Sequence, residues 1–299
     1  MATTSPLSPG DHYFEADGVR FHYFVQGAGP LFVLVTVGWG AGGAYLRHGL
    51  GPRLEPKHTV VYVDPRGNGE SGEPADAATM TAGTMAEDLE LLREHLGVDA
   101  FPALLGHSHA GGVVLRYAER RPARVGRLVL LDAQVLDAPA GTHVADWMAR
   151  REGVEAYAAA SEQLRALGGA GPFPTTDDEF AAALDRLLPW YFSDAAKTDV
   201  LRAHLAAGPG RPRVYALQTN AHDAAPANKL PHLAEAGKVE ARTLVLWGEE
   251  DPILDVETGR ALAGRIRGAR LAVLEGVGHF PWIEAPEKFW AALEAFMES

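Results

Sequence analysis

Ser108 has the sequence surroundings of a catalytic nucleophile. It follows an apolar, strand-like run and immediately precedes a helix-like stretch. A serine on such a sharp strand-to-helix turn exposes its hydroxyl at the carboxyl end of a sheet, and the turn needs small residues two positions before and after the serine. Gly106 and Ala110 occupy those positions. The other role open to Ser108 is that of a helix N-cap, which any serine before a helix can fill.

His279 is the best placed of the 12 histidines to act as the base for this serine. A serine hydroxyl is a weak nucleophile until a base removes its proton. His279 lies in a glycine-flanked loop that follows the last strand-like run and precedes the last helix-like stretch. In a parallel sheet this position brings the imidazole to the same edge as Ser108.

A carboxylate is then needed to orient the imidazole and to stabilise its protonated form. Asp251 lies in the loop after the penultimate strand-like run. Asp132 is the alternative, because an acid at the end of the preceding strand can reach the same histidine. We favour Asp251, so the predicted catalytic residues are Ser108, Asp251 and His279.

The elements that must position these residues alternate between strand and helix. A predicted hairpin comes first, with strands His12–Ala16 and Val19–Val25 joined by Asp17-Gly18. Continuous apolar runs follow, which are typical of strands covered on both faces, at Leu31–Val37, Thr59–Val63, Ala103–Leu105, Arg127–Leu131, Thr243–Trp247 and Leu271–Leu274. Helical periodicity separates them, at Thr81–Leu96, Val113–Glu119, Val256–Ile266 and Pro286–Met297. The sequence therefore predicts an α/β fold with a mostly parallel, predominantly eight-stranded sheet and helices on both faces.

This alternation stops between about Gln134 and Arg242. The intervening stretch shows no convincing strand and has helical patterns broken by glycine and proline, at Ala145–Tyr157, Glu179–Leu188 and Thr198–Leu205. We interpret it as a helical lid, inserted between two strands over the sheet edge where ligands bind. The predicted organisation is an α/β core of residues 1–134 and 242–299 with a lid of residues 135–241.

Together these features resemble the serine-triad branch of the α/β-hydrolase fold superfamily, which includes esterases and prolyl-aminopeptidase-like enzymes. That superfamily uses the chain order serine, acid, histidine. Leu31–Gly40 resembles the strand and following segment that supply one oxyanion amide there, and Asp64–Gly72 resembles its Asp-x-Arg-Gly-x-Gly-x-Ser loop. The resemblance extends over nearly all of residues 12–298, although the lid matches only in position and helical character.

By this resemblance, the backbone amides of Trp39 and His109 form the oxyanion hole. Removing one such donor typically costs about 2.7–4 kcal/mol of transition-state stabilisation. Two positions depart from the family pattern, because Val37 stands where histidine is usual and Ala110 stands where glycine is usual. The serine at position 108 argues against the epoxide hydrolases and dehalogenases of the same fold, which use aspartate there.

The predicted lid carries aromatic and acidic residues with more than one possible role. Trp147, Trp190 and Tyr191 are candidates for the substrate pocket, although a helical lid also needs a packed core of its own. The glycine-rich run Gly38–Leu46 resembles that of prolyl-aminopeptidase-like members, but His109 stands where those enzymes commonly have tryptophan. Such enzymes bind the substrate amine with lid acids, and the acids available here are Asp177, Asp178, Glu179 and Asp194.

Composition and charge exclude several classes of protein. The 299 residues carry 27 Lys and Arg against 39 Asp and Glu, a net charge of −12, so no basic excess is available for the phosphates of nucleic acid. The absence of cysteine rules out disulfides and cysteine nucleophiles. No apolar run reaches the roughly 18 residues of a membrane span, and no secretory signal is visible. We therefore expect a cytoplasmic protein that binds neither nucleic acid nor membrane.

Two further patterns are typical of cofactor sites but lack the context that such sites need. Gly67–Gly72 matches the glycine spacing of a dinucleotide-binding turn, yet the next helix starts only near Thr81. His107 and His109 have no acidic or histidine partner at ligand spacing. We therefore expect no organic cofactor and no metal.

The sequence as a whole predicts a serine hydrolase that cleaves a small or medium carboxylic ester or lactone through an acyl-enzyme on Ser108. The alternatives are a prolyl-aminopeptidase-like or amide hydrolase, a carbon–carbon hydrolase with the same triad, and a non-hydrolytic biosynthetic enzyme or ligand receptor of this fold. The expected partner is a small-molecule acyl substrate, and nothing in the sequence indicates an oligomeric state.

Overall fold

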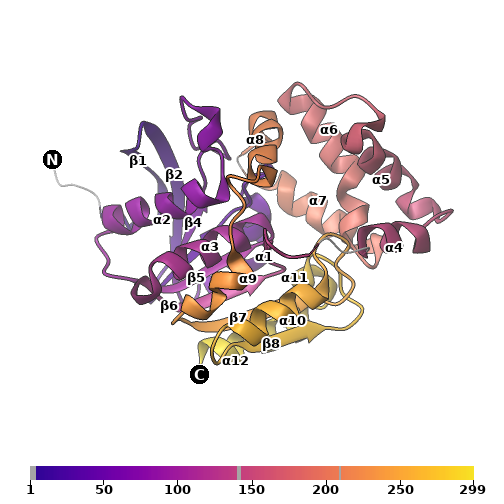
Figure 1. Ribbon diagram of the computed structural model, residues 1–299. Helices are drawn as coiled ribbons and strands as arrows, with labels where there is room; N and C mark the ends of the chain where they lie inside the picture. Colours follow the sequence, from indigo (N-terminus) through magenta and orange to yellow (C-terminus); the bar gives the residue numbers. More distant parts are fainter. Residues whose placement is uncertain (1–4, 140–142, 209) are drawn as a thin grey trace.

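One eight-stranded sheet forms the centre of the molecule in the computed structural model, which describes residues 5–139, 143–208 and 210–299 (Figure 1). The strands lie in the order β1-β2-β4-β3-β5-β6-β7-β8. Their bounds are β1 Gly10–Ala16, β2 Val19–Gly27, β3 Leu31–Val35, β4 Thr59–Asp64, β5 Phe101–His107, β6 Val125–Leu131, β7 Arg242–Gly248 and β8 Arg270–Leu274. The pairs β1–β2 and β2–β4 are antiparallel and every other pair is parallel. The predicted mostly parallel, eight-stranded sheet is therefore confirmed.

The first two strands form the predicted hairpin. Asp17 and Gly18 connect them with φ angles of 48° and 69°. Positive φ at both positions of a two-residue turn fits the twist of antiparallel strands, and aspartate and glycine adopt such angles more readily than most residues. The local sequence thus determines this turn.

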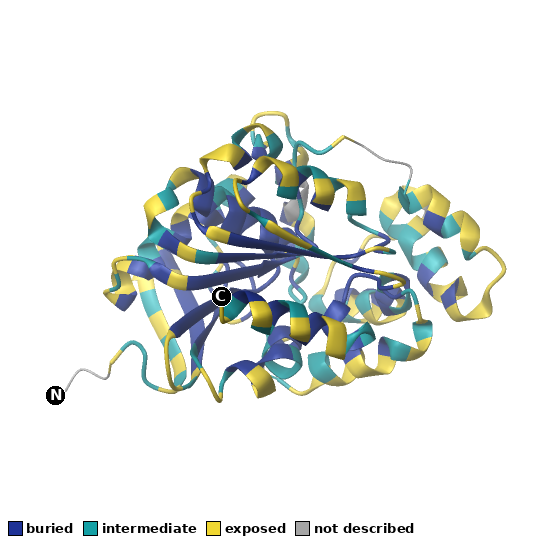
Figure 2. Ribbon diagram, turned by 90° about the horizontal axis from the view of Figure 1, so that it is seen from below, coloured by how far each residue is buried: buried dark blue, intermediate teal, exposed yellow. Residues whose placement is uncertain are grey.

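The central strands send alternate side chains into two separate cores. Along β3, Val33 and Val35 contribute to one core, while Phe32 and Leu34 contribute to the other. Helices α2 (Ala82–Leu96), α3 (His109–Arg120) and α10 (Val256–Arg265) cover the first face, and α1 (Ala44–Leu54), α11 (Pro281–Glu284) and α12 (Pro286–Met297) cover the second. Because both faces are covered, the strands are dark blue in Figure 2 and apolar throughout in the sequence. The edge strands are the exceptions, since Tyr13 in β1 and Leu271 in β8 are 39% and 40% exposed.

Helix α1 is an element that the sequence pattern does not predict. It contains two glycines and a proline, which disfavour a helix, although Leu46, Leu50 and Leu54 form a buried apolar stripe. Tertiary packing explains the glycines: a Cβ at Gly49 would lie 2.4 Å from the indole nitrogen of Trp282, and one at Gly51 would lie 2.7 Å from the hydroxyl of Tyr62. The composition of α1 therefore reflects its close packing on neighbouring side chains rather than its helical propensity.

Between β6 and β7 the chain forms helices and, in the part that the structure describes, no strand. We call residues 135–241 the insert. Its helices are α4 His143–Arg150, α5 Glu155–Arg165, α6 Asp177–Leu187, α7 Thr198–Ala206, α8 Val214–Thr219 and α9 His232–Glu235, with short turns η3 Ala166–Ala170, η4 Leu188–Tyr191, η5 Ala195–Lys197, η6 Asn220–Ala224 and η7 Ala236–Lys238. In Figure 1, α4 to α7 gather at one side of the core. Within the described ranges, no helix is long and apolar enough to cross a membrane.

One helix predicted for the insert is wrong in its extent. The single helix expected over Ala145–Tyr157 is instead two helices, α4 and α5. They are separated at Gly153, whose φ of 76° is incompatible with a continuous right-handed helix. Apolar periodicity extends across this break because both helices contribute side chains to the same small core.

Candidate active site

Ser108 lies at the junction of β5 and α3 in a conformation that residues other than glycine rarely adopt. Its φ is 57° and its ψ is −127°, so the chain turns sharply between His107, the last residue of β5, and His109, the first of α3. Tertiary contacts maintain this strained geometry. The amide of Ser108 donates to the carbonyl of Leu131 at 3.0 Å, and its carbonyl accepts from the amide of Gln134 at 2.8 Å.

The residues around this turn must be small because α3 packs directly on the strands. A Cβ at Gly106 would lie 2.3 Å from the carbonyl oxygen of Ala110, and one at Gly111 would lie 2.4 Å from the Cβ of Ala133. Ser108 occupies the N-cap position of α3, but its side chain makes no capping hydrogen bond to the helix. In the part of the chain that the structure describes, its hydroxyl has no hydrogen-bond partner and faces a cavity.

His279 and Asp251 form a buried pair. The Nδ1 atom of His279 lies 2.6 Å from Oδ2 of Asp251, and both side chains are almost fully buried. The other carboxylate oxygen of Asp251 accepts hydrogen bonds from the amides of Ile253 at 2.8 Å and Leu254 at 3.1 Å. The imidazole is thus held through Nδ1, which leaves its Nε2 atom available to a reacting group.

Asp132, the alternative acid, makes no hydrogen bond to the imidazole. It is completely buried, has a φ of 41°, and accepts a hydrogen bond from the amide of Gly248 at 2.8 Å. Burial and then the negative charge of Asp251 raise the pKa of Asp132 well above its usual range, which favours the neutral form. Of the two acids, Asp251 is the one bonded to His279.

The two backbone amides predicted to form the oxyanion hole are unpaired among the described residues. Neither the amide of Trp39 nor that of His109 has a hydrogen-bond acceptor there. His109 is the first residue of α3, and the first amides of a helix have no partner within the helix. Both donors are therefore available to an anion formed beside Ser108.

Asn68 holds the segment that carries Trp39. Its side-chain oxygen accepts from the amide of Gly40 at 2.7 Å, and its side-chain nitrogen donates to the carbonyl of Arg66 at 2.8 Å. Asn68 is completely buried. Asn68 thus anchors this segment, in which position 37 is a valine. Sequence reasoning found the loop that contains Asn68 but not the role of its side chain.

The side chain of His109 joins the turn at Ser108 to the insert. Its Nε2 atom lies 2.8 Å from Oδ2 of Asp223 in η6, and the other oxygen of Asp223 accepts from the amide of Ala82, the first residue of α2. The opposite side of the imidazole packs on the Trp39 segment, since a Cβ at Gly38 would lie 2.6 Å from Nδ1 of His109. This contact joins positions 114 residues apart, so no local pattern predicts it.

His107 is a buried histidine that supports His279. Its Nε2 atom lies 2.9 Å from the carbonyl oxygen of His279 and its Nδ1 lies 3.1 Å from the hydroxyl of Tyr45. Since Nε2 must donate to a carbonyl, Nδ1 is the acceptor for Tyr45. Burial, followed by the charge of His279, lowers the pKa of His107 well below its usual range. A neutral His107 adds no second positive charge beside His279.

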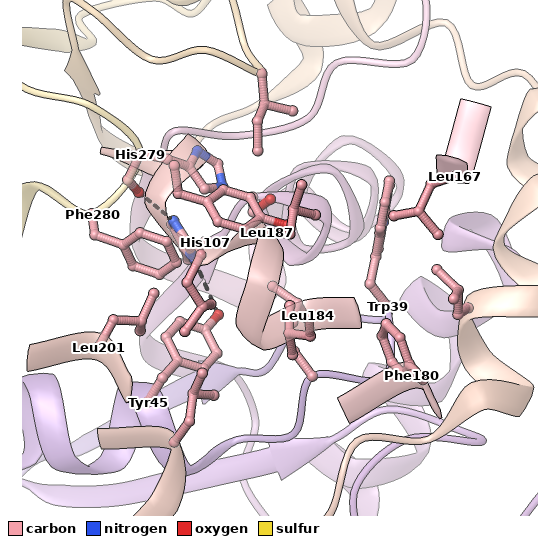
Figure 3. Close-up of a pocket in the computed structure, with 18 residues that line it drawn as sticks. Trp39, Tyr45, His107, Leu167, Phe180, Leu184, Leu187, Leu201, His279 and Phe280 are labelled. Carbon is pink, nitrogen blue, oxygen red and sulfur yellow. Dashed lines mark hydrogen bonds between the residues drawn. The ribbon is translucent and has the colours of Figure 1, made fainter. Parts of the chain in front are cut away.

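Ser108 and His279 line one cavity of about 110 Å³ between the core and the insert (Figure 3). Leucines from the insert and aromatic rings form most of its wall, and none of the lysine, arginine, aspartate or glutamate residues that the structure describes lines it. In Figure 3, Tyr45 and Leu201 lie on the side opposite to Trp39 and Leu167. The cavity is therefore apolar except at the reacting groups.

Of the three aromatic residues predicted for the substrate pocket, only Tyr191 lines this cavity. Trp190 lines a second cavity beside it. Trp147 lines neither, so its assignment to the substrate pocket is wrong. It is 1% exposed and packs edge-on against Tyr157 and Trp190, with ring centroids 5.3 and 6.1 Å apart. Trp147 thus forms the core that holds the insert helices together.

The acidic residues considered as amine ligands lie away from the cavity. Asp177, Asp178 and Glu179 form the first turn of α6, and Asp194 caps η5. None of them lines the cavity of Ser108, and Asp177 instead accepts a hydrogen bond from the amide of Val214. Among the described residues, no group of three or more histidine, aspartate or glutamate side chains has the arrangement of a metal site.

The comparisons with known proteins identify the family of the chain. Residues 31–286 match the α/β-hydrolase fold family, to which the chain therefore belongs. An uncharacterised protein of Mycobacterium bovis is 25% identical over 310 residues, which cover 94% of this chain and 79% of the relative. The 2-hydroxy-6-oxononadienedioate/2-hydroxy-6-oxononatrienedioate hydrolase of Paraburkholderia xenovorans is 24% identical over 289 residues, 92% of this chain and 90% of the relative. Among solved structures, an α/β-fold family hydrolase from Bacillus anthracis has a TM-score of 0.73 at 18% identity, covering 96% of this chain and 98% of the other.

Proposed function

We propose that this protein is a serine hydrolase that cleaves a carboxylic ester or lactone. One observation carries the proposal: an apolar cavity brings together Ser108, on its strained turn, and His279, held by the buried carboxylate of Asp251. The hydrolase among the sequence relatives supports the same class of reaction.

The first half of the proposed reaction transfers the acyl group to the enzyme. The Oγ atom of Ser108 bonds to the carbonyl carbon while Nε2 of His279 takes its proton, and the amides of Trp39 and His109 stabilise the negative oxygen. The bond between the carbonyl carbon and the alcohol oxygen then breaks. His279 gives its proton to that oxygen, so the alcohol of an ester leaves as a neutral molecule, whereas that of a lactone becomes a hydroxyl group on the acyl chain.

The second half returns the enzyme to its starting state. His279 removes a proton from water, the water oxygen bonds to the acyl carbon, and the bond to Ser108 breaks as the serine recovers a proton. Asp251 stays ionised and stabilises the imidazolium in both halves. The neutral form of His107, favoured by its lowered pKa, avoids repulsion with that imidazolium.

The relative from Paraburkholderia xenovorans is named for substrates that carry two carboxylates. We favour an ester or lactone over such a diacid because no lysine or arginine lines the cavity of Ser108. A carboxylate there would lose its hydration without gaining an ionic partner. An aminopeptidase is disfavoured in the same way, since no aspartate or glutamate of the described chain lines this cavity to pair with a substrate amine.

Covalent labelling with a fluorophosphonate tests the proposal. We expect one adduct by intact mass on the wild-type protein and none on Ser108→Ala, together with loss of p-nitrophenyl butanoate hydrolysis. Ser161→Ala is the matched control, because Ser161 lies in α5 outside the cavity, and it should label as the wild type does. A folded wild-type protein that neither labels nor hydrolyses the ester would refute the proposal and favour a receptor or a non-hydrolytic enzyme.

A further inference from the structure

A second cavity adjoins the one that contains Ser108. Its volume is about 800 Å³, compared with about 110 Å³ for the first. Six residues line both cavities and form the boundary between them: Trp39, Leu167, Leu187, Tyr191, Leu217 and Ile253. Ser108 and His279 line only the first. A substrate that extends beyond its reacting carbonyl therefore has two distinct directions in which to place its two halves.

The two cavities differ in chemistry. The first is hydrocarbon-lined and ends against side chains with almost no exposure, Leu201 at 1%, Tyr45 at 2% and Leu188 at 3%. The second includes the charged residues Asp223, Lys229 and Asp255 in its lining, and also Phe173, which is 45% exposed. The first thus has one buried apolar end, whereas the second includes charged groups and an exposed ring.

The order of product release decides which half of the substrate occupies which cavity. In the proposed reaction the alcohol leaves while the acyl group is still bonded to Ser108, and water must then reach the acyl carbon. The buried end of the first cavity, at Tyr45, Leu188 and Leu201, offers no path for either step, so the alcohol departs on the side that adjoins the second cavity. The acyl group stays against the buried end, where its hydrocarbon is shielded from water.

We propose that the Ser108 cavity binds the acyl part of the ester as an uncharged hydrocarbon chain and that the second cavity binds the alcohol part, which is larger and can be polar. This assignment rests on the proposed function. It predicts selectivity for chain length on the acyl side and tolerance on the alcohol side, with the two sides controlled by different residues.

Two ester series measure the two sides separately. In the first, the acyl group of p-nitrophenyl esters lengthens from acetyl through butanoyl to octanoyl. In the second, the alcohol of butanoate esters lengthens from methyl to octyl. We expect kcat/KM in the wild type to favour butanoyl or octanoyl over acetyl by about tenfold or more, the scale on which added methylenes discriminate in apolar pockets. The p-nitrophenyl hydrogen adipate ester, with a terminal carboxylate, should be at least about tenfold poorer than octanoyl.

Leu205→Trp and Leu164→Trp are matched variants for this test. Both leucines are half-buried residues of the insert, but Leu205 lines only the first of the two cavities and Leu164 only the second. We expect Leu205→Trp to lower the octanoyl-to-acetyl ratio of kcat/KM by about tenfold and to leave the octyl-to-methyl ratio unchanged. Leu164→Trp should lower the octyl-to-methyl ratio of kcat/KM and leave the octanoyl-to-acetyl ratio unchanged. If a tryptophan variant does not fold, the phenylalanine variant at the same position replaces it.

The possible outcomes separate this assignment from the proposed function. If Leu205→Trp changes the alcohol series and leaves the acyl series unchanged, the orientation of the substrate is opposite to the one proposed. If the wild type shows no acyl-length preference or accepts the adipate ester as well as the octanoyl ester, the assignment is wrong. In both cases fluorophosphonate labelling of Ser108 still supports a serine hydrolase. Absence of labelling and of ester turnover would overturn both.

Discussion

The buried carboxylates at the end of β6 and after β7 have different environments, which divides their roles at the level of single residues. Asp251 accepts hydrogen bonds from two amides and from the imidazole of His279, and such bonds favour an ionised carboxylate. Asp132 accepts from the amide of Gly248, while its other oxygen is buried without a hydrogen-bond partner among the described residues. Two adjacent acids can coexist in such a site when one of them is neutral.

Substituting each acid separately tests this division. We expect Asp251→Asn to lower kcat/KM for p-nitrophenyl butanoate by roughly 10³–10⁴-fold, because an amide in that position favours the wrong imidazole tautomer. Asp132→Asn should lower it by less than about tenfold, because asparagine resembles the neutral acid. Steady-state kinetics with circular dichroism as a folding control measures both. Equal losses in the two variants would contradict the assignment of Asp251.

Asn68 is expected to matter for rate rather than for substrate affinity. Asn68→Ala removes the acceptor for the amide of Gly40 and frees the segment that carries Trp39. Because an oxyanion donor acts in the transition state, we expect kcat to fall by roughly 10–100-fold with a smaller change in KM. The measurement is a Michaelis curve for a butanoate ester. A higher KM with an unchanged kcat would mean that Asn68 supports substrate binding instead.

At the scale of elements, the site depends on parallel strands that end at one edge of the sheet. Ser108 follows β5, Asp251 follows β7 and His279 follows β8, so residues far apart in the chain converge at one edge of the sheet. The insert then contributes walls to the cavity from α6, η4 and α7. The insert also contacts the turn at Ser108, through the hydrogen bond between His109 and Asp223.

Removing that contact is expected to affect both stability and catalysis. Asp223→Ala leaves two buried donors without an acceptor, His109 Nε2 and the amide of Ala82, at a cost of about 1–3 kcal/mol for each. It also frees the imidazole that packs on Gly38, so kcat should fall. Urea denaturation and ester kinetics measure the two effects. Asp177→Ala is the control, because Asp177 accepts an amide hydrogen bond within the insert and should reduce stability with little change in kcat.

At the scale of the whole molecule, the antiparallel end of the sheet carries a second titratable cluster, distinct from the active-site histidines. His22 in β2 bonds to Asp64 through Nδ1 at 2.8 Å and to Asp11 through Nε2 at 3.1 Å. Burial by itself lowers the pKa of His22, but the hydrogen bonds and charges of Asp64 and Asp11 raise it overall. The protonated imidazole thus links β1, β2 and the loop that begins at Asp64.

This cluster predicts a defined pH dependence of stability. Because the pKa of His22 is higher in the folded than in the unfolded chain, its stabilising contribution is fully present below the unfolded pKa of about 6.5 and is lost as the pH rises through the folded pKa. The difference in unfolding free energy between the wild type and His22→Gln should therefore be largest below about pH 6.5 and shrink as the pH rises through the raised folded pKa of His22. Urea denaturation at a series of pH values measures it, and a difference that grows with pH would contradict the prediction.

The sequence by itself determined those features that depend on local periodicity and backbone conformation. Continuous apolar runs separated by helical patterns are sufficient to predict a parallel sheet, because strands covered on both faces need apolar side chains at every position. The hairpin at Asp17-Gly18 follows from the positive φ angles that these residues tolerate. The positions of Ser108, Asp251 and His279 after their strands follow from the same alternation, since parallel strands end at one edge.

Only the tertiary structure decided the contacts between segments that are distant in the sequence. It shows that Trp147 packs inside the insert while Tyr191 lines the cavity, although both are aromatic residues in helical surroundings. It also reveals that Asn68 holds the Trp39 segment and that Asp223 bonds to His109. These arrangements depend on how the insert docks on the core, and side-chain packing between distant segments leaves no periodic pattern in either one.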